Sequence, residues 1–276
     1  MHRAVLVGTP VMELRKYRQH IDALDDYGRT PLRLAVELGN LEVVKELLEN
    51  LNSNPNLPDS SKVTPLHVAC SRGDIEVVDL LLRKVEEQAV VDVNGETPLI
   101  TCCRTMHWEI VPRLTKIDVA IADAKGKTAL HWMIQNVASI SECNGALEYL
   151  LTNRCNVNAQ DERGRAPLHL AASRGFVDAC QILIKRGAQK DIPDNLGETP
   201  LHKCIMKPSL LQGKPTVLQY LLDSKVDILI KRNDGKTAYD VLCSMLTERT
   251  WNENQKLALE VGIRLLKRAM DDLQKA

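Results

Sequence analysis

The chain has 276 residues, and its 36 basic and 36 acidic side chains cancel, so no bulk charge favours nucleic acid or anionic lipid. Aromatic residues make up only 3% against 44% for all hydrophobic residues, which favours helices packed through Leu, Val, Ile and Ala over a β-sandwich. No apolar run approaches the roughly 18 residues of a membrane span, and residues 1–20 lack a signal-peptide stretch. The eight cysteines show no disulfide framework. We expect a soluble, mostly helical protein of the cytoplasm, with the nucleus as a second compartment.

One phrase recurs along the chain. TPLRLAVELGNLEVVKELL starts at Thr30, and TPLHVACSRGDIEVVDLLL starts 34 residues later at Thr64. Related phrases start at Thr97, Thr128, Ala166 and Thr199, and a degraded copy starts at Thr237. The spacing is 33 residues from Thr64 to Thr97 and again from Ala166 to Thr199. Self-similarity at such a period predicts a stack of structural repeats.

Each phrase predicts the same local structure. The upstream Asp-x-x-Gly, as at 25–28, is a turn in which Asp bonds nearby backbone and Gly accepts a positive φ. Thr then caps a helix, and Pro fits the first position of that helix. A glycine such as Gly39 ends the helix, and a second helix with paired leucines follows, as at Leu47 and Leu48. Such a unit buries its apolar face only against its neighbours.

The period of 33 and the phrase T-P-L-H-x-A resemble the ankyrin repeat, and the resemblance covers nearly the whole chain. It implies an all-α repeat solenoid of stacked helix-turn-helix units with β-turn or hairpin fingers. We expect a single ankyrin-repeat domain over residues 1–276. Its expected parts are a truncated N-terminal unit (1–24), six full repeats (25–58, 59–91, 92–122, 123–160, 161–193 and 194–231) and an atypical C-terminal helical cap (232–276).

The two ends of the chain are irregular, as capping units are. Residues 1–17 enter at the Leu-His-x-Ala position, with His2 on the motif histidine, which indicates a shortened cap or a part of a longer protein. At the other end, Asn252 and Gln255 have the spacing of a helix N-cap.

Two substitutions and two insertions depart from the repeat pattern, and each leads to an expectation. Lys62 stands where the turn glycine belongs, so we expect a less regular finger there, and Met106 replaces the helix-breaking glycine, so we expect a weak break. Five-residue insertions around 137–144 and 207–214 fall between the two helices of a unit. Such insertions are binding loops on one face or simply tolerated lengthening.

Cys102, Cys103 and His107 have the short spacing of a metal site or a reactive thiol. The repeat register favours packing instead, because the two cysteines fall where Ala171 and Ala172 fall in a later repeat. The motif's fourth position holds His67, His131, His169 and His202. The resemblance implies that this histidine bonds backbone around the turn and ties repeats together. We therefore expect no metal, cofactor or catalytic residue.

Cys143 differs from the other cysteines because it lies in the first insertion. An exposed, oxidation-sensitive thiol is the alternative to a buried one there.

In ankyrin-like proteins, partners commonly contact the turn tips and the exposed end of the first helix, on the concave side. The expected partner-binding residues are Tyr27, Arg29, Arg72, Arg104, Lys125, Lys127, Glu162, Arg163, Arg165, Arg174 and Lys207. These positions lean basic, most densely from Lys125 to Arg174, which predicts docking of an acidic or phosphorylated protein segment. Ordinary solvated charges are the alternative.

The predicted function is a non-catalytic protein–protein interaction module, an adaptor, scaffold or inhibitor, acting as a monomer. Two alternatives stand beside it: a regulatory ankyrin region of a longer protein whose effector domain lies elsewhere, and a nuclear regulator of transcription factors. An enzyme would need a pocket in residues 237–276 or in the insertions, where no acid–base pair stands out.

Overall fold

The computed structural model describes residues 1–8, 10–85, 87–211, 216–248 and 251–275, and these residues form helices, turns and loops with one isolated bridge between Ala122 and Thr128. The α-helices are α1 (His2–Leu6), α2 (Val11–Leu14), α3 (Pro31–Leu38), α4 (Leu41–Lys45), α5 (Pro65–Arg72), α6 (Ile75–Leu82), α7 (Pro98–Thr105), α8 (Ala129–Asn136), α9 (Asn144–Thr152), α10 (Pro167–Arg174), α11 (Val177–Lys185), α12 (Pro200–Ile205), α13 (Val217–Asp223), α14 (Ala238–Glu248) and α15 (Glu253–Lys275). Shorter 3-10 helices are η1 (Arg15–His20), η3 (Trp108–Arg113), η4 (Ile140–Cys143) and η5 (Pro208–Leu211), and η2 (Glu46–Asn50) is a π-helical turn.

These elements form two compact units, which we describe separately. The first comprises Met1–Asn136 with Ser141–Cys155, and the second comprises Val137–Ile140 with Asn156–Ala276. Among the described helices none is both long and apolar enough to cross a bilayer; α15 has the length but carries charged residues throughout.

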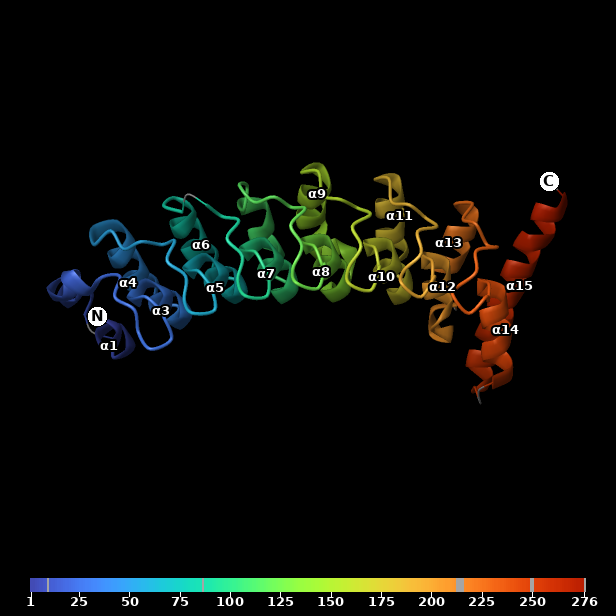
Figure 1. Ribbon diagram of the computed structural model, residues 1–276, viewed down its shortest axis with the longest axis horizontal. Helices are drawn as coiled ribbons and strands as arrows, with labels where there is room; N and C mark the ends of the chain where they lie inside the picture. Colours follow the sequence, from blue (N-terminus) through green and yellow to red (C-terminus); the bar gives the residue numbers. More distant parts are fainter. Residues whose placement is uncertain (9, 86, 212–215, 249–250, 276) are drawn as a thin grey trace. The chain divides into compact units, whose positions relative to one another are not determined.

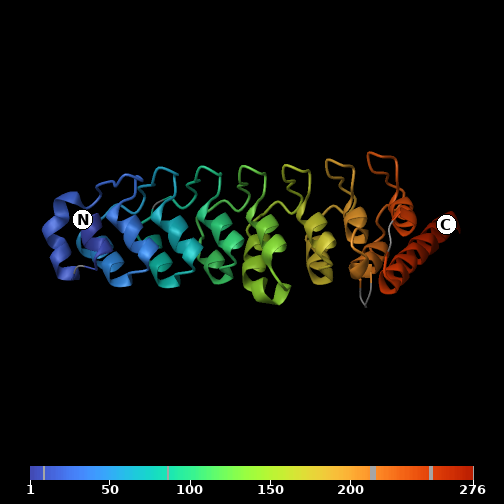
Figure 2. The same cartoon turned by 90° about the horizontal axis from the view of Figure 1, so that it is seen from below.

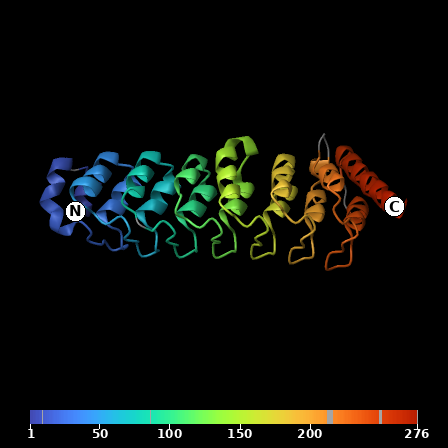
Figure 3. The same ribbon diagram turned by 90° about the horizontal axis from the view of Figure 1, so that it is seen from above.

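In the first unit the first helices of successive repeats pack side by side, with α3 against α5, α5 against α7 and α7 against α8 (Figure 1). The fingers that precede these helices all extend from the same side of this unit (Figure 2), and the view from the opposite direction shows the helix pairs in a row (Figure 3). Each repeat therefore contributes one finger and one first helix to a common face, as the sequence predicted.

The first helices begin and end as their residues predict. The Thr30 hydroxyl accepts the backbone N–H of Arg33 at 3.1 Å, Pro31 occupies the first helical position, and Gly39 ends the helix with a φ of +70°. A cap of this kind stabilises a helix by about 1 kcal/mol. The same start recurs at Thr97, whose hydroxyl accepts the N–H of Ile100 at 3.2 Å.

Two expected irregularities are wrong. Lys62 adopts a φ of +60°, so its finger keeps the bonds of the others: Asp59 Oδ1 accepts the N–H of Ser61 at 2.9 Å and that of Val63 at 3.0 Å. Met106 adopts a φ of +67° and ends α7 in the left-handed conformation that glycine gives elsewhere. This backbone conformation costs a residue other than glycine about 1 to 2 kcal/mol.

The third full repeat is irregular in its second helix rather than at its break. Residues 108–113 form a short 3-10 helix that contains Pro112, where the neighbouring repeats have α-helices. Trp108 begins this segment and is buried, so its large side chain contributes to the core of the repeat.

In the second unit the degraded copy retains the architecture. The N–H of Arg232 donates to the Lys236 carbonyl at 2.9 Å and Gly235 has a φ of +79°, so the finger is complete without the usual aspartate. Asn252 and Gln255 exchange backbone–side-chain bonds of 3.2 and 2.9 Å at the start of α15, which confirms the expected cap.

The described part of the second insertion is structural. Residues 208–211 form η5, which packs against α15, and Leu211 is buried beside Gly262 of that helix. Residues 212–214 of the insertion lie outside the described residues. The segment that contacts α15 supports the C-terminal helix. This role is neither of the two alternatives expected for the insertion, a binding loop or tolerated lengthening.

Candidate interaction surface

The fingers are joined to one another through their tips. In the first unit the N–H of Ser60 donates to the Tyr27 carbonyl at 3.2 Å, that of Val93 to Ser61 at 3.0 Å, and that of Ala124 to Asn94 at 2.8 Å. In the second unit the N–H of Asn195 donates to Arg163 and that of Asn233 to Leu196, each at 3.0 Å. The tips are therefore preorganised by a repeated backbone bond.

The side chain at the second tip position varies from finger to finger, while the backbone does not. The second tip residues are Tyr27, Ser61, Asn94, Lys125, Arg163, Leu196 and Asp234, and all seven are exposed. This position thus presents aromatic, polar, basic, apolar and acidic side chains in one backbone setting. Glu162, at the first tip position of its finger, is exposed as well.

The side chain of the residue before the helix-capping position makes ion pairs or hydrogen bonds within the fold. The Arg29 guanidinium bonds Asp25 at 2.9 Å and Glu37 at 3.1 Å, and the Arg165 guanidinium bonds Asp161 at 2.7 Å. Lys127 is buried, and its ammonium donates to Gln135 at 2.7 Å and lies 4.0 Å from the centre of the Trp132 ring. Because Lys127 is buried, it is unsuited to contact a partner, and we no longer expect it among the partner-binding residues.

The turn aspartates are ionised and hold the following arginine side chains by ion pairs. Burial pushes the pKa of Asp161 up, but hydrogen bonds from the Arg165 side chain and from backbone N–H groups outweigh burial, so its pKa lies below the ordinary value. The pKa of Asp25 is lowered in the same way, with burial opposed by the backbone and side chain of Arg29. Arg29 and Arg165 are therefore internal partners of ionised carboxylates before any ligand binds.

At the end of each first helix, a side chain from the next repeat bonds an otherwise free carbonyl. Arg72 Nη1 donates to Glu37 O at 2.9 Å, His107 Nε2 lies 3.1 Å from Ser71 O, and Asn136 Nδ2 donates to Arg104 O at 2.9 Å. These carbonyls occupy the same position in α3, α5 and α7. Helix ends carry unpaired carbonyls and partial negative charge, so each bond stabilises the junction between repeats.

These junction residues were missed in the sequence because they differ in residue type, and because His107 lies farther from its capping Thr than Arg72 and Asn136 lie from theirs. The role of His107 answers the question raised by its proximity to Cys103: the ring crosses to the preceding repeat and lies over Gly73. In the second unit Leu210 lies over Gly175 in a similar way. These contacts are visible in the sequence only when one repeat is aligned with the next, because no local motif marks them.

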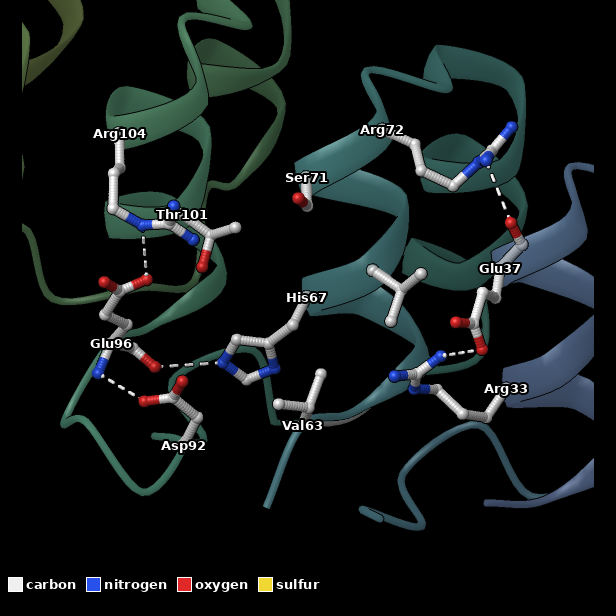
Figure 4. Close-up of a pocket in the computed structure, with 11 residues that line it drawn as sticks. Arg33, Glu37, Val63, His67, Ser71, Arg72, Asp92, Glu96, Thr101 and Arg104 are labelled. Atoms are coloured by element: carbon white, nitrogen blue, oxygen red, sulfur yellow. Dashed lines mark hydrogen bonds and ion pairs between the residues drawn. The ribbon is translucent and has the colours of Figure 1, made fainter. Parts of the chain in front are cut away.

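The surface of the first unit is hollowed between α3, α5 and α7 (Figure 4). The hollow has a volume of about 300 Å³, and its lining contains two internal ion pairs. Arg104 bonds Glu96 at 2.9 Å and Arg33 bonds Glu37 at 2.9 Å. Arg104 is thus partly neutralised, and the hollow by itself does not select an anion.

Three histidines at the motif position each tie a first helix to the next finger, whereas the buried Nε2 of His202 has no hydrogen-bond partner in the described part of the chain. His67 Nε2 lies 3.0 Å from Glu96 O, His169 Nε2 lies 3.0 Å from Glu198 O, and His2 Nε2 lies 2.7 Å from Arg29 O. In His67 the other ring nitrogen accepts the N–H of Thr64 at 3.2 Å, so Nε2 carries the proton and donates. These bonds are the ones that the resemblance implied.

We expect acid to weaken the fold through these histidines. Burial lowers the pKa of His67, His169 and His202, so they stay neutral at pH values where the unfolded chain binds protons near its ordinary pKa of about 6.5. Stability is complete above that value and falls as the pH drops below it, by at most about 1.4 kcal/mol per pH unit for each histidine. Urea unfolding between about pH 7.5 and 5 measures the loss, above the range in which carboxylates titrate. An unchanged or rising midpoint on acidification would contradict this account.

The cysteines pack rather than react. Cys70, Cys102, Cys103 and Cys204 are buried, and burial raises the pKa of Cys103 well above its ordinary value. Cys143 is also buried, with its pKa raised by burial to about 11, so the exposed thiol considered for the insertion is wrong. Within the described residues, no group of three or more His, Cys, Asp or Glu side chains is arranged to hold a metal ion.

The remaining expected contact residues divide by their surroundings. Lys207 is exposed at the end of α12, whereas Arg174 is half-buried with its guanidinium 4.4 Å from the centre of the Phe176 ring. A repeated framework of fingers and helix pairs, with varied side chains only at exposed tips, defines a recognition class of repeat protein.

Comparison with known proteins gives the family. A family model described as "Ankyrin repeats (3 copies)" matches residues 1–92, 66–143 and 136–234. The chain belongs to the ankyrin repeat family. Ankyrin repeats are protein-interaction modules, and their fold is usually non-catalytic.

Individual relatives agree with this assignment. Palmitoyltransferase AKR1 of Lachancea kluyveri is 31% identical over 224 residues, which cover 78% of this chain and 29% of that protein. The transient receptor potential cation channel subfamily A member 1 of Homo sapiens is 31% identical over 81% of this chain and 17% of that protein. The chain therefore spans less than a third of the length of these relatives.

Among solved structures, the ankyrin repeat domain of Bcl-3, described as a unique member of the IkappaB protein family, is similar with a TM-score of 0.58 and 26% identity. The match covers 72% of this chain and 91% of that domain. The helical repeat fold expected from the sequence is thereby confirmed.

Proposed function

We propose that this chain is a non-catalytic adaptor, scaffold or inhibitor that binds an acidic or phosphorylated segment of a partner protein through its finger tips and first-helix ends. It acts as a monomer in the cytoplasm and also in the nucleus. The observation that carries the proposal is the second tip position, where seven exposed residues of different types occur and where the carbonyls of Tyr27, Ser61, Asn94, Arg163 and Leu196 accept the bond from the next finger. A preformed surface of this kind binds without a large ordering cost.

We propose an acidic segment because three exposed cationic side chains form no ion pair with any residue that the structure describes. Lys125 and Arg163 are exposed at tips, and Lys207 is exposed at the end of α12. In the described part of the chain these three side chains have no ion-pair partner, unlike Arg29 and Arg165. Exposed cations without an ion-pair partner attract an acidic segment and accelerate its association.

The test is capture of partners from a lysate of the source cells on the immobilised protein. We expect the triple variant Lys125→Glu, Arg163→Glu, Lys207→Glu to retain about tenfold less of the partner bound by the wild type, because each contact changes from attraction to repulsion. The wild-type complex should also weaken as salt rises from about 0.05 to 0.3 M.

A matched variant controls for net charge. Lys84→Glu, Lys256→Glu, Lys267→Glu reverses three other exposed lysines and should bind the partner as the wild type does. If the first triple variant keeps wild-type capture and wild-type salt dependence, the proposal fails. Arg165 and Arg174 are poor choices for this test because their side chains are held by Asp161 and Phe176.

A second candidate is the regulatory ankyrin region of a longer protein. It is supported by the relatives, in which the matching stretch is 29% and 17% of the whole protein. An immunoblot of the endogenous protein discriminates the two: a species near 30.9 kDa supports a separate adaptor, and a much larger species supports the regulatory region.

A further inference from the structure

A second surface, in the second unit, has a different chemistry from the finger tips. An open groove of about 710 Å³ lies between the end of α13, the loop that follows it and the C-terminal part of α15. Val226 and Ile228 are nearly buried in this groove, and Leu222 and Ala269 are half-buried beside them. None of the tip residues lines it, so it is separate from the surface proposed above.

One wall of the groove is an apolar stripe of α15 that lacks cover. The buried residues of this helix end at Leu266, yet the stripe continues through Ala269 and Met270 to Leu273 at helical spacing. Leu273 is 56% exposed. The last two turns of the helix therefore present an unpartnered apolar face to the groove.

The rim of the groove is acidic. The lining residues with charge are Asp191, Asp223, Asp227, Asp272 and Lys225. Four carboxylates face one ammonium in a chain whose net charge is zero. The neighbouring Lys190 ammonium donates to the Ser224 carbonyl at the end of α13 and keeps its charge, so the four carboxylates outnumber the two ammonium groups at the groove.

The carboxylates retain acceptor capacity for a ligand. Asp191 Oδ1 accepts the N–H of Asp227 at 3.0 Å, and Asp223 Oδ1 accepts Gln219 at 2.8 Å, each through one oxygen. Asp272 has no bonded partner in the described part of the chain, although Arg268 precedes it by one turn of α15. Asp191 and Asp223 are thus held by hydrogen bonds, and no ion pair among the described residues neutralises the acidic rim.

We propose that this groove binds a basic amphipathic helix of a partner protein. The apolar floor would take leucine-like side chains at i, i+3 and i+7, and the four aspartates would pair with lysine or arginine at the edges of that helix. Charge complementarity selects this occupant over an acidic segment. The protein would then hold two partner segments of opposite charge, one at the finger tips and one here.

The test uses two synthetic peptides and fluorescence anisotropy with the full chain. The first is a labelled helical peptide of about 16 residues with leucines on one face and lysine and arginine at its edges; the second replaces each cation with glutamate. We expect the first peptide to bind and the second to bind at least about tenfold more weakly at about 0.1 M salt.

Leu273→Ser should weaken binding of the basic peptide about tenfold, through lost apolar burial. The double variant Asp223→Asn, Asp272→Asn should weaken it about fivefold at about 0.05 M salt and less at about 0.5 M. Leu257→Ser is the matched control: Leu257 is 54% exposed on the same helix, does not line the groove and should leave binding unchanged. Equal thermal midpoints of the two serine variants exclude a folding effect.

Three results would overturn the proposal. They are equal binding of the two peptides, wild-type binding by Leu273→Ser, and no binding of the basic peptide up to about millimolar concentration. Concentration-dependent dimers in sedimentation that disappear with Leu273→Ser would assign the groove to a second copy of this chain instead. Failure here leaves the finger-tip proposal untouched, since no residue is shared.

Discussion

Replacing His169 with alanine should destabilise the second unit by about 3 kcal/mol. The ring is fully buried and makes two bonds, accepting the N–H of Ala166 at 3.1 Å and donating to Glu198 O at 3.0 Å. Alanine leaves a buried donor and part of a buried acceptor unpaired and opens a cavity. Urea unfolding followed by circular dichroism measures the change.

The control for this prediction is His20→Ala, which removes an exposed histidine and should change stability by less than about 0.5 kcal/mol. A loss below about 1 kcal/mol for His169→Ala would mean that the bond between helix and finger contributes little. The chain itself shows that the slot tolerates other residues in other settings, since Arg33 and Ile100 occupy it in two repeats.

Gly164→Ala should cost about 3 kcal/mol, whereas Gly235→Ala should cost about 1 kcal/mol. Both glycines have a positive φ, +74° and +79°, so both substitutions impose the same backbone penalty. A Cβ on Gly164 would lie 2.7 Å from the backbone N of Asn195, which makes the tip bond to Arg163 O, whereas a Cβ on Gly235 would meet nothing within 4 Å.

The difference between the two variants isolates the bond between fingers from the conformational cost of a side chain. Thermal and urea unfolding of both variants in parallel give this difference directly. Equal losses for Gly164→Ala and Gly235→Ala would show that the tip bond adds nothing to stability, and the preorganised surface proposed here would lose its physical basis.

The sequence predicted the repeat, the fingers and the capped first helices, because each depends on residues at fixed spacing from the capping Thr. The role of the motif histidine was implied by the resemblance to the ankyrin repeat. The contacts between repeats at the ends of the first helices escaped prediction. Arg72, His107 and Asn136 perform one task with three side chains, so no motif marks them. The left-handed conformations of Lys62 and Met106 likewise escaped prediction, because they run against the local preference of residues other than glycine.

The binding surface was predicted as a set of positions but not as individual side chains. Charge alone placed Lys127 beside Lys125, yet the first is buried against Trp132 and the second is exposed at a tip. In the fingers at 25–28 and 161–164 the base residues Arg29 and Arg165 are held in internal ion pairs, whereas the exposed tip residues Lys125 and Arg163 have no ion-pair partner in the described part of the chain. This division is visible only when the partners of each charge are known.

Hydrogen–deuterium exchange of the protein with and without its captured partner tests the central claim most directly. The account predicts that partner binding protects the fingers and the ends of the first helices, including the segments around Lys125, Arg163 and Lys207, and leaves the second helices α4, α6 and α11 unchanged. Protection confined to the second helices, with the finger tips exchanging as in the free protein, would contradict it.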